Sequence, residues 1–126
     1  MIEFKNVSKV YDNGSVALDD VCLTINDGEF ILVCGHSGAG KSTLFKLLTH
    51  EVVPDAGTVI VDDFDVTRMK RSKIPKLRRK LGVVFQDFRL LPNKTVAENI
   101  AFALEVIEEK PKIIKEKVSH VLELVG

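Results

Sequence analysis

Apolar and polar positions alternate in two stretches near the N-terminus of the chain. Residues 2–8 alternate, and residues 17–25 contain a second such run with Val21, Leu23 and Ile25 on one side. Alternation places every second side chain on the same face of a strand. Turn-forming residues follow each run, at 12–15 and 26–28. The pattern predicts two half-buried strands of an antiparallel sheet.

Three further apolar runs predict strands at 30–34, 58–63 and 81–85. The first and last are expected to be buried core strands. The run at 58–63 ends in Asp62 and Asp63, which resembles a magnesium-binding strand. Because it is bounded by turn signals and follows the turn-forming residues 54–57, which end the preceding helix, we favour a peripheral hairpin strand instead.

Apolar residues recur at helical spacing in four later segments. The first begins near Lys41, the second lies in 68–80, the third starts with the capping box Thr95–Glu98, and the fourth starts at Pro111. The apolar positions of the first and third helices are Leu44, Leu47 and Leu48, and Ile100, Ala101, Leu104 and Ile107. In the second and fourth helices the residues expected to be buried are Ile74, Leu77 and Leu81, and Ile114, Val118, Val121, Leu122 and Val125.

The segment 68–80 holds eight Lys or Arg among thirteen residues. It is either a nucleic-acid patch or the solvated face of a helix. No aromatic residue is interleaved for stacking on bases, and the formal net charge of the whole chain is zero. We therefore favour the solvated helix face and expect no nucleic-acid partner.

Composition places the chain among ordinary soluble proteins. Its 126 residues correspond to one domain or part of one, and no apolar run approaches the roughly 20 residues of a membrane helix. The N-terminus lacks the layout of a signal peptide, so we expect a cytosolic protein. Cys22 and Cys34 are expected to pack as small hydrophobic residues.

The stretch Gly35–Ser42 carries the clearest chemistry. It has the form G-x-x-x-x-G-K-S of a phosphate-binding loop, between a predicted strand and a predicted helix. Gly35, Gly38 and Gly40 are expected to adopt backbone angles closed to other residues. Backbone N–H groups and the helix N-terminus then face an anion. Lys41 adds a positive charge for phosphate, and the Ser42 hydroxyl is placed to bind Mg²⁺.

Four features in order extend this motif to a family. They are Tyr11, the phosphate loop, the strand end Val83–Gln86 and the helix start Thr95–Asn99. Together they resemble the N-terminal half of an ATP-binding-cassette ATPase domain over residues 1–126. The resemblance implies an α/β fold, with part of the phosphate-loop core and an antiparallel β appendage at 1–86 and the start of a helical subdomain at 87–126. The residues at 85–92 and 96–107 are similar to members that act in bacterial cell division.

The resemblance implies roles for individual residues. Tyr11 would stack on the adenine of ATP. Gln86 would bind Mg²⁺ together with Ser42, sense the γ-phosphate and act with Lys41 in catalysis. The residues that would hold the phosphates are Gly35, Ser37, Gly38, Ala39, Gly40, Lys41, Ser42 and Thr43.

The resemblance also implies partners. An integral membrane subunit would contact the region of Gln86, the complete domain would form a homodimer, and the protein would lie at the inner face of the cell membrane. ATP hydrolysis by the complete domain would drive the membrane partner in cell division. The alternatives are an exporter ATPase for lipoproteins or small molecules, and a fragment that binds nucleotide without hydrolysing it. A kinase-type enzyme would need a phosphoacceptor lid, and none is visible.

Some family features are missing from the sequence. It lacks the Leu-Ser-Gly-Gly-Gln signature, the apolar strand ending in Asp-Glu, and the switch histidine. His36 stands where the family often has proline, and Asp63 where it usually has a turn glycine. Because phosphoryl transfer depends on positioned metal, water and charged groups, we expect no steady ATP turnover from these residues alone.

Overall fold

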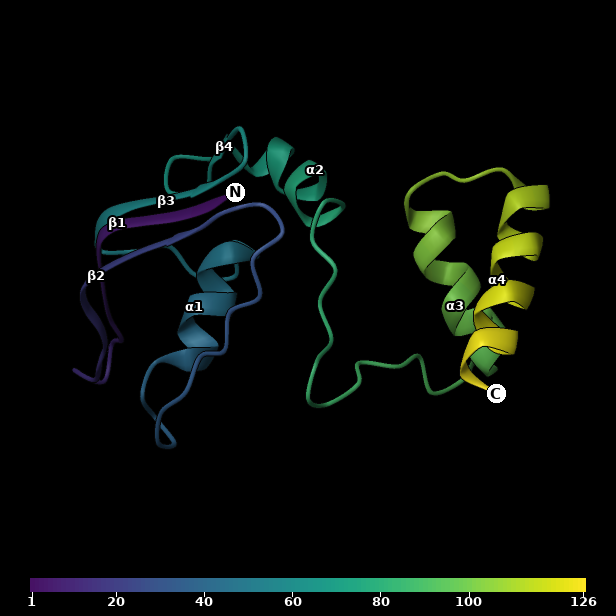
Figure 1. The fold of residues 1–126 in the computed structure, drawn as a ribbon, viewed down its shortest axis with the longest axis horizontal. Helices are drawn as coiled ribbons and strands as arrows, with labels where there is room; N and C mark the ends of the chain where they lie inside the picture. The colour runs from purple at the N-terminus through teal and green to yellow at the C-terminus, as the bar shows by residue number, and fades with distance from the viewer. The chain divides into compact units, whose positions relative to one another are not determined.

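The computed structural model describes residues 1–126, which form two compact units. Unit 1 comprises Met1–Leu81 and unit 2 comprises Gly82–Gly126. A sheet with short helices makes up the first, and a pair of helices makes up most of the second (Figure 1). No helix in the structure is long and apolar enough to cross a membrane. The predicted division of the family domain after residue 86 stays a prediction.

Unit 1 is built on a four-stranded antiparallel sheet. Its strands are β1 (Ile2–Val10), β2 (Val16–Ile25), β3 (Ala56–Val61) and β4 (Phe64–Asp65). Their order across the sheet is β2-β1-β3-β4, and every neighbouring pair is antiparallel. The two N-terminal strands and the hairpin strand at 58–63 are therefore confirmed.

Alternation in β2 is also confirmed. Val21, Leu23 and Ile25 are half-buried, whereas Cys22 and Thr24 between them are exposed. The prediction that Cys22 packs as a hydrophobic residue is therefore wrong: it falls on the outward face of the strand, where its sulfur accepts a hydrogen bond from the Asn6 N–H at 3.3 Å.

The helix α1 (Lys41–Leu48) lies against one face of this sheet (Figure 1). Leu47 is fully buried, and Leu44 and Leu48 pack against the same core, as their spacing predicts. Burying these side chains against the strands stabilises the helix more than its own eight residues do. The buried apolar residues of unit 1 are Phe4, Val7, Leu18, Leu47, Val59, Val61, Val66 and Leu77.

The two predicted core strands at 30–34 and 81–85 are absent. Phe30 is 91% exposed and Val84 is 99% exposed. A strand is held by hydrogen bonds to a neighbouring strand, and no segment of the chain pairs with either run. Cys34, in the first run, is exposed as well. The predictions of buried strands and of a packed Cys34 are wrong because apolar content alone does not supply a partner strand.

The basic stretch forms shorter helices than its pattern predicts. A 3₁₀ turn, η1 (Arg71–Lys73), leads into the helix α2 (Ile74–Arg78). Pro75 stands in the first turn of α2, where its missing N–H costs no helical hydrogen bond. Leu77 is completely buried and Ile74 is half-buried, so the predicted apolar stripe is confirmed.

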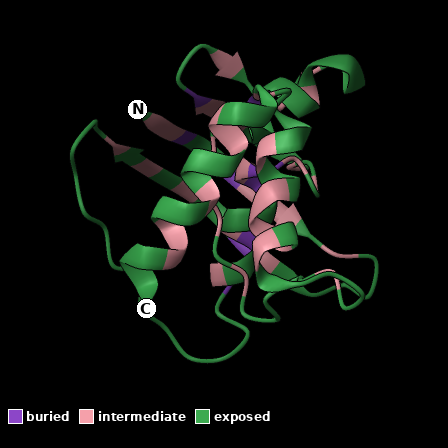
Figure 2. Cartoon of the chain, turned by 90° about the vertical axis from the view of Figure 1, so that its right-hand side faces the viewer, coloured by how far each residue is buried: buried purple, intermediate pink, exposed green.

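Unit 2 contains the helices α3 (Val96–Val106) and α4 (Pro111–Val125). Both starts were predicted correctly: Thr95 and Glu98 form the reciprocal capping box, and Pro111 occupies the first turn of α4. Figure 2 shows only half-buried and exposed positions on these two helices, and unit 2 has no buried residue. Ile107 is 42% exposed and Val125 is 75% exposed. The predicted burial of Val125 is wrong, because two helices alone cover only the stripe where they meet.

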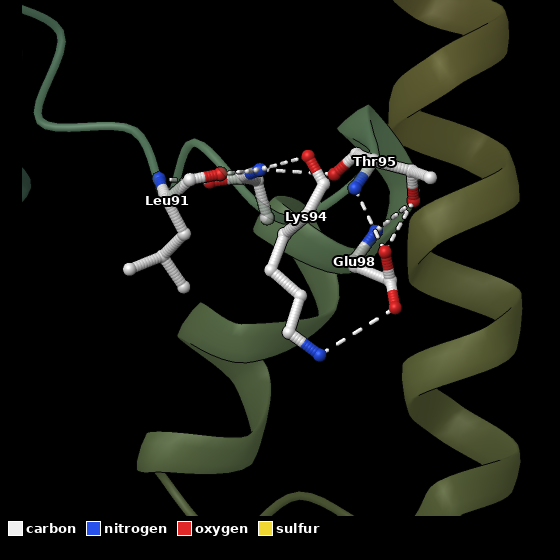
Figure 3. Close-up of polar contacts among 5 residues, drawn as sticks. Leu91, Lys94, Thr95 and Glu98 are labelled. Carbon is white, nitrogen blue, oxygen red and sulfur yellow. Dashed lines mark hydrogen bonds and ion pairs between the residues drawn. The ribbon is translucent and has the colours of Figure 1, made fainter.

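Leu91, Lys94 and Thr95 lie close together at the start of α3 (Figure 3). The side chain of Asn99 connects them: its Oδ1 accepts from the Leu91 N–H at 2.8 Å, and its Nδ2 donates to the carbonyls of Leu91, Lys94 and Thr95 at 3.2, 3.2 and 2.9 Å. The Thr95 Oγ1 accepts a hydrogen bond from the Glu98 N–H at 3.2 Å, and the Thr95 N–H donates to the Glu98 carboxylate at 2.7 Å. Side-chain hydrogen bonds thus define this helix start.

Candidate functional site

The phosphate loop turns directly into α1 through Gly40. This residue is buried and is the N-cap of the helix, with φ of 82°, in the left-handed region that favours glycine. A Cβ atom on Gly40 would lie 2.2 Å from the carbonyl oxygen of Ala17 in β2. Gly40 is therefore required both by its backbone angles and by its closeness to β2.

Gly35 differs from this expectation. Its φ is not positive, whereas Gly38 has φ of 83°. A Cβ on Gly35 would instead lie 3.0 Å from the Cβ of Ala39, across the loop. The prediction of unusual backbone angles is wrong for Gly35, where the close approach of two parts of the loop favours glycine.

Lys41 folds back over the loop. Its ammonium donates to the carbonyl oxygens of Gly35 at 2.6 Å and of His36 at 2.7 Å. An ammonium has three donor hydrogens, so these two bonds leave one for an anionic oxygen. His36 adds a contact within the loop, with its Nδ1 2.8 Å from the Ser37 carbonyl oxygen. Because a carbonyl only accepts, this bond requires the proton on Nδ1.

The first turn of α1 faces the same region. The N–H groups of Lys41 and Ser42, at the first two helical positions, have no carbonyl acceptor within the helix. No acidic residue lies in this turn, so nothing opposes the positive end of the helix dipole. Ser42 is exposed, and its hydroxyl makes no hydrogen bond within the protein. This arrangement suits an anion such as phosphate.

Tyr11 reaches the helix from the end of β1. Its hydroxyl lies 3.2 Å from Oγ1 of Thr43, which is 5% exposed. The ammonium of Lys9 lies 5.9 Å from the centre of the Tyr11 ring. The structure therefore brings Tyr11 to the first turn of α1, and the proposed stacking on adenine stays a prediction.

Gln86 is exposed and belongs to unit 2. Its role at the phosphate loop therefore stays a prediction. The acidic end of β3 has other partners: Asp62 accepts from the N-terminal ammonium at 2.7 Å and lies 3.9 Å from Lys80. The N-terminal ammonium holds the pKa of Asp62 below its ordinary value, first through this hydrogen bond and then through its positive charge. No group of three or more His, Cys, Asp and Glu side chains is placed to hold a metal ion.

Two contacts at the site were missed at the level of sequence, although Tyr11 and Thr43 were both predicted as site residues. The carbonyl of Ala17 limits the residue at position 40, and the Thr43 hydroxyl meets Tyr11. A backbone carbonyl leaves no signal in the sequence, because every residue has one. The Tyr11–Thr43 contact spans 32 positions and depends on the packing of α1 on the sheet.

Comparison with known proteins identifies the family of the chain. The family profile described as ABC transporter matches residues 18–126. The cell division ATP-binding protein FtsE of Bacillus subtilis (strain 168) is 53% identical over 125 residues, which are 99% of this chain and 55% of that protein. The methionine import ATP-binding protein MetN of Helicobacter acinonychis (strain Sheeba) is 43% identical over 126 residues, covering 100% of this chain and 38% of MetN. The chain thus spans about half the length of these curated relatives, or less.

A solved structure gives the same result. The dimeric post-hydrolysis state of the ATP-binding cassette MJ0796, bound to ADP and Pi, matches with a TM-score of 0.86 and 32% identity. The match covers 98% of this chain and 56% of that one. The fold is therefore a partial α/β fold of the phosphate-loop type with an antiparallel sheet, and the chain belongs to the ABC transporter family.

Proposed function

We propose that this chain is the nucleotide-binding part of an ABC-type ATP-binding subunit, and that its phosphate loop binds ATP. The observation that carries the proposal is the convergence of three groups on one region: the Lys41 ammonium, the first N–H groups of α1 and the Ser42 hydroxyl. The solved relative MJ0796 holds ADP and Pi, which supports a nucleoside phosphate as the ligand.

Each residue has a distinct task in this proposal. Lys41 contributes a charge-assisted hydrogen bond to the terminal phosphates while its two bonds to loop carbonyls hold the loop closed. The N–H groups at the start of α1 bind phosphate oxygens, as helix N-termini do. Tyr11 presents an aromatic face to adenine, and Gly35, Ser37, Gly38, Ala39, Gly40 and Thr43 complete the cradle.

The residues present also fit Mg²⁺. This ion prefers oxygen ligands and usually binds through one or two protein groups together with substrate phosphates. Ser42 offers an exposed hydroxyl at the start of α1, and we propose it as the ligand that unit 1 supplies. When bound, Mg²⁺ neutralises charge on the phosphates. The lack of a cage of acidic side chains is consistent with an ion that arrives with the nucleotide.

We further propose that the whole subunit hydrolyses ATP, dimerises, and drives an integral membrane partner at the inner face of the cell membrane. Cell division is the favoured process, because the FtsE proteins of Bacillus subtilis and Streptococcus pneumoniae are 53% and 50% identical to this chain. Import of a small molecule is the second candidate, because MetN relatives also match the whole chain. Identifying the membrane protein that co-purifies with the intact subunit distinguishes the two.

Nucleotide titration tests the proposed site directly. Replacing Lys41 with alanine removes a hydrogen bond from a charged group, worth about 1.5–3 kcal/mol, so ATP affinity should fall about tenfold to a hundredfold. Lys46→Ala is the matched control, because Lys46 is an exposed lysine in the last turn of the same helix. Equal ATP affinity of the two variants and the unaltered chain would remove the phosphate-binding function.

A further inference from the structure

Unit 1 also carries a strongly basic surface that takes no part in the phosphate loop. Residues 68–80, the basic segment, hold eight Lys or Arg, all exposed, and no Asp or Glu. The rest of unit 1 holds four Lys or Arg and eleven Asp or Glu. The positive charge of this unit is therefore gathered in one short segment.

Most of these charges are not neutralised within the protein. Lys80 lies 3.9 Å from Asp62 and 5.5 Å from the ring centre of Phe64. Five other basic side chains form no ion pair: Arg68, Lys70, Arg71, Lys73 and Lys76. Their positive field extends into solvent over about one Debye length, roughly 8–10 Å at moderate salt.

The basic segment is fixed to the core. Leu77 is fully buried, and the Arg78 guanidinium donates to the Thr49 carbonyl at 2.9 Å. Figure 1 shows α2 beside β4, at the end of unit 1 away from the loop that precedes α1. The backbone of the basic segment is thus anchored to the core through Leu77 and Arg78, and the segment shares no residue with the phosphate loop.

We propose that the basic segment binds the surface of an anionic lipid bilayer through the phosphate headgroups. Clusters of four to eight Lys or Arg on a helix are typical of such contacts, which need no apolar insertion. None of the large apolar side chains of the segment is exposed. The segment therefore offers no apolar side chain that a protein partner could bury at the centre of an interface. It has no aromatic residue to stack on nucleic-acid bases.

Charge elsewhere in unit 1 favours a membrane over a polyanion that wraps around the protein. The excess of acidic residues outside the segment repels phosphates along most of the unit surface. A bilayer surface requires contact on one side only. The proposal does not depend on nucleotide binding, because the segment shares no residue with the phosphate loop.

Flotation with lipid vesicles tests the proposal. The chain is mixed with vesicles of phosphatidylglycerol and phosphatidylcholine in equal amounts, or of phosphatidylcholine alone, at low and high salt. Each charge near such a surface is worth about a fivefold change in binding, so Lys70→Gln, Lys73→Gln and Lys76→Gln together should weaken binding about a hundredfold. The matched control replaces Lys110, Lys112 and Lys115, three exposed lysines of unit 2 that form no ion pair, with glutamine.

Binding to anionic vesicles only, lost at high salt and in the variant of the basic segment but kept in the control, supports the proposal. Three results would overturn it: no binding to anionic vesicles, an equal loss in both triple variants, or tighter binding to duplex DNA than to the vesicles. Circular dichroism and ATP titration of each variant show whether a loss arises from unfolding, and Arg71→Gln alone, expected to weaken binding about fivefold, repeats the test with a single change.

Discussion

Gly40 offers the sharpest test of how the phosphate loop is held. Replacing it with alanine adds one methyl group at a position where φ is 82° and the carbonyl oxygen of Ala17 would lie 2.2 Å away. Gly38→Ala is a matched control, because Gly38 has φ of 83° and no atom within 4 Å of its ideal Cβ. The two variants share the backbone strain and differ in the contact with β2.

The expected costs follow from these values. A left-handed conformation costs an alanine about 1–2 kcal/mol, and this cost applies to both variants. Both also gain equally from the smaller conformational freedom of the unfolded chain. In Gly40→Ala the new carbon must move about 1 Å to reach an ordinary separation of roughly 3.3 Å from the oxygen. Overpacking of this kind costs about 1–3 kcal/mol more.

Urea unfolding of the two variants without nucleotide measures this difference. Gly40→Ala should lose about 1–3 kcal/mol more unfolding free energy than Gly38→Ala, mainly through a lower midpoint at an unchanged slope. ATP affinity should also fall in Gly40→Ala, because the N–H groups that follow residue 40 change direction. If both variants lose the same stability, Gly40 does not pack against β2 and this account of the loop is wrong.

Three further predictions concern other parts of the chain. Tyr11→Ala should weaken ATP about tenfold to a hundredfold, the value of one stacked base, and leave pyrophosphate binding nearly unchanged, whereas Tyr11→Phe should bind ATP almost normally; equal losses for both ligands would exclude stacking. Asn99→Ala should cost about 1–2 kcal/mol and speed hydrogen exchange at the Leu91 amide, while Asn93→Ala, in the same loop, should do neither; equal effects in unfolding and exchange would contradict the structure. Hydrogen bonds from the Val10 N–H and then from the Lys9 ammonium hold the pKa of Asp55 below its ordinary value. The stabilising effect of Asp55 should therefore be present above the unfolded pKa of about 3.9 and be lost as pH falls through the lower folded pKa. Asp55→Asn should abolish this contribution to the acid dependence of stability, and unfolding curves with the same pH dependence for both proteins would refute it.

The sequence predicted those elements whose signals are local. The alternation in β2, the Thr95–Glu98 capping box and Pro111 at the start of α4 were all correct. Each depends on residues within a few positions of one another. Within the phosphate loop only the bonds of Lys41 are local, to carbonyls five and six positions away, whereas the close approach of Gly40 to Ala17 joins distant parts of the chain.

The wrong predictions have a different physical origin. A buried strand at 30–34 or 81–85 requires a neighbour that supplies hydrogen bonds and covers its faces, and neither run has one. Burial of Val125 likewise requires a third element beside α3 and α4. The composition of a segment indicates what it is suited to, and only its neighbours decide whether that structure forms.

These contacts also determine which side of the phosphate loop is anchored. After residue 37 the chain is held by Gly40 against β2 and by Leu47 in the core. Before residue 37 the chain runs through exposed positions, and the Lys41 ammonium, bonded to two carbonyls, is its main attachment to α1. Lys41 therefore has a structural task besides binding phosphate. We expect Lys41→Ala to increase hydrogen exchange at residues 35–37 even without nucleotide, and unchanged exchange there would show that the two carbonyl bonds do not hold the loop.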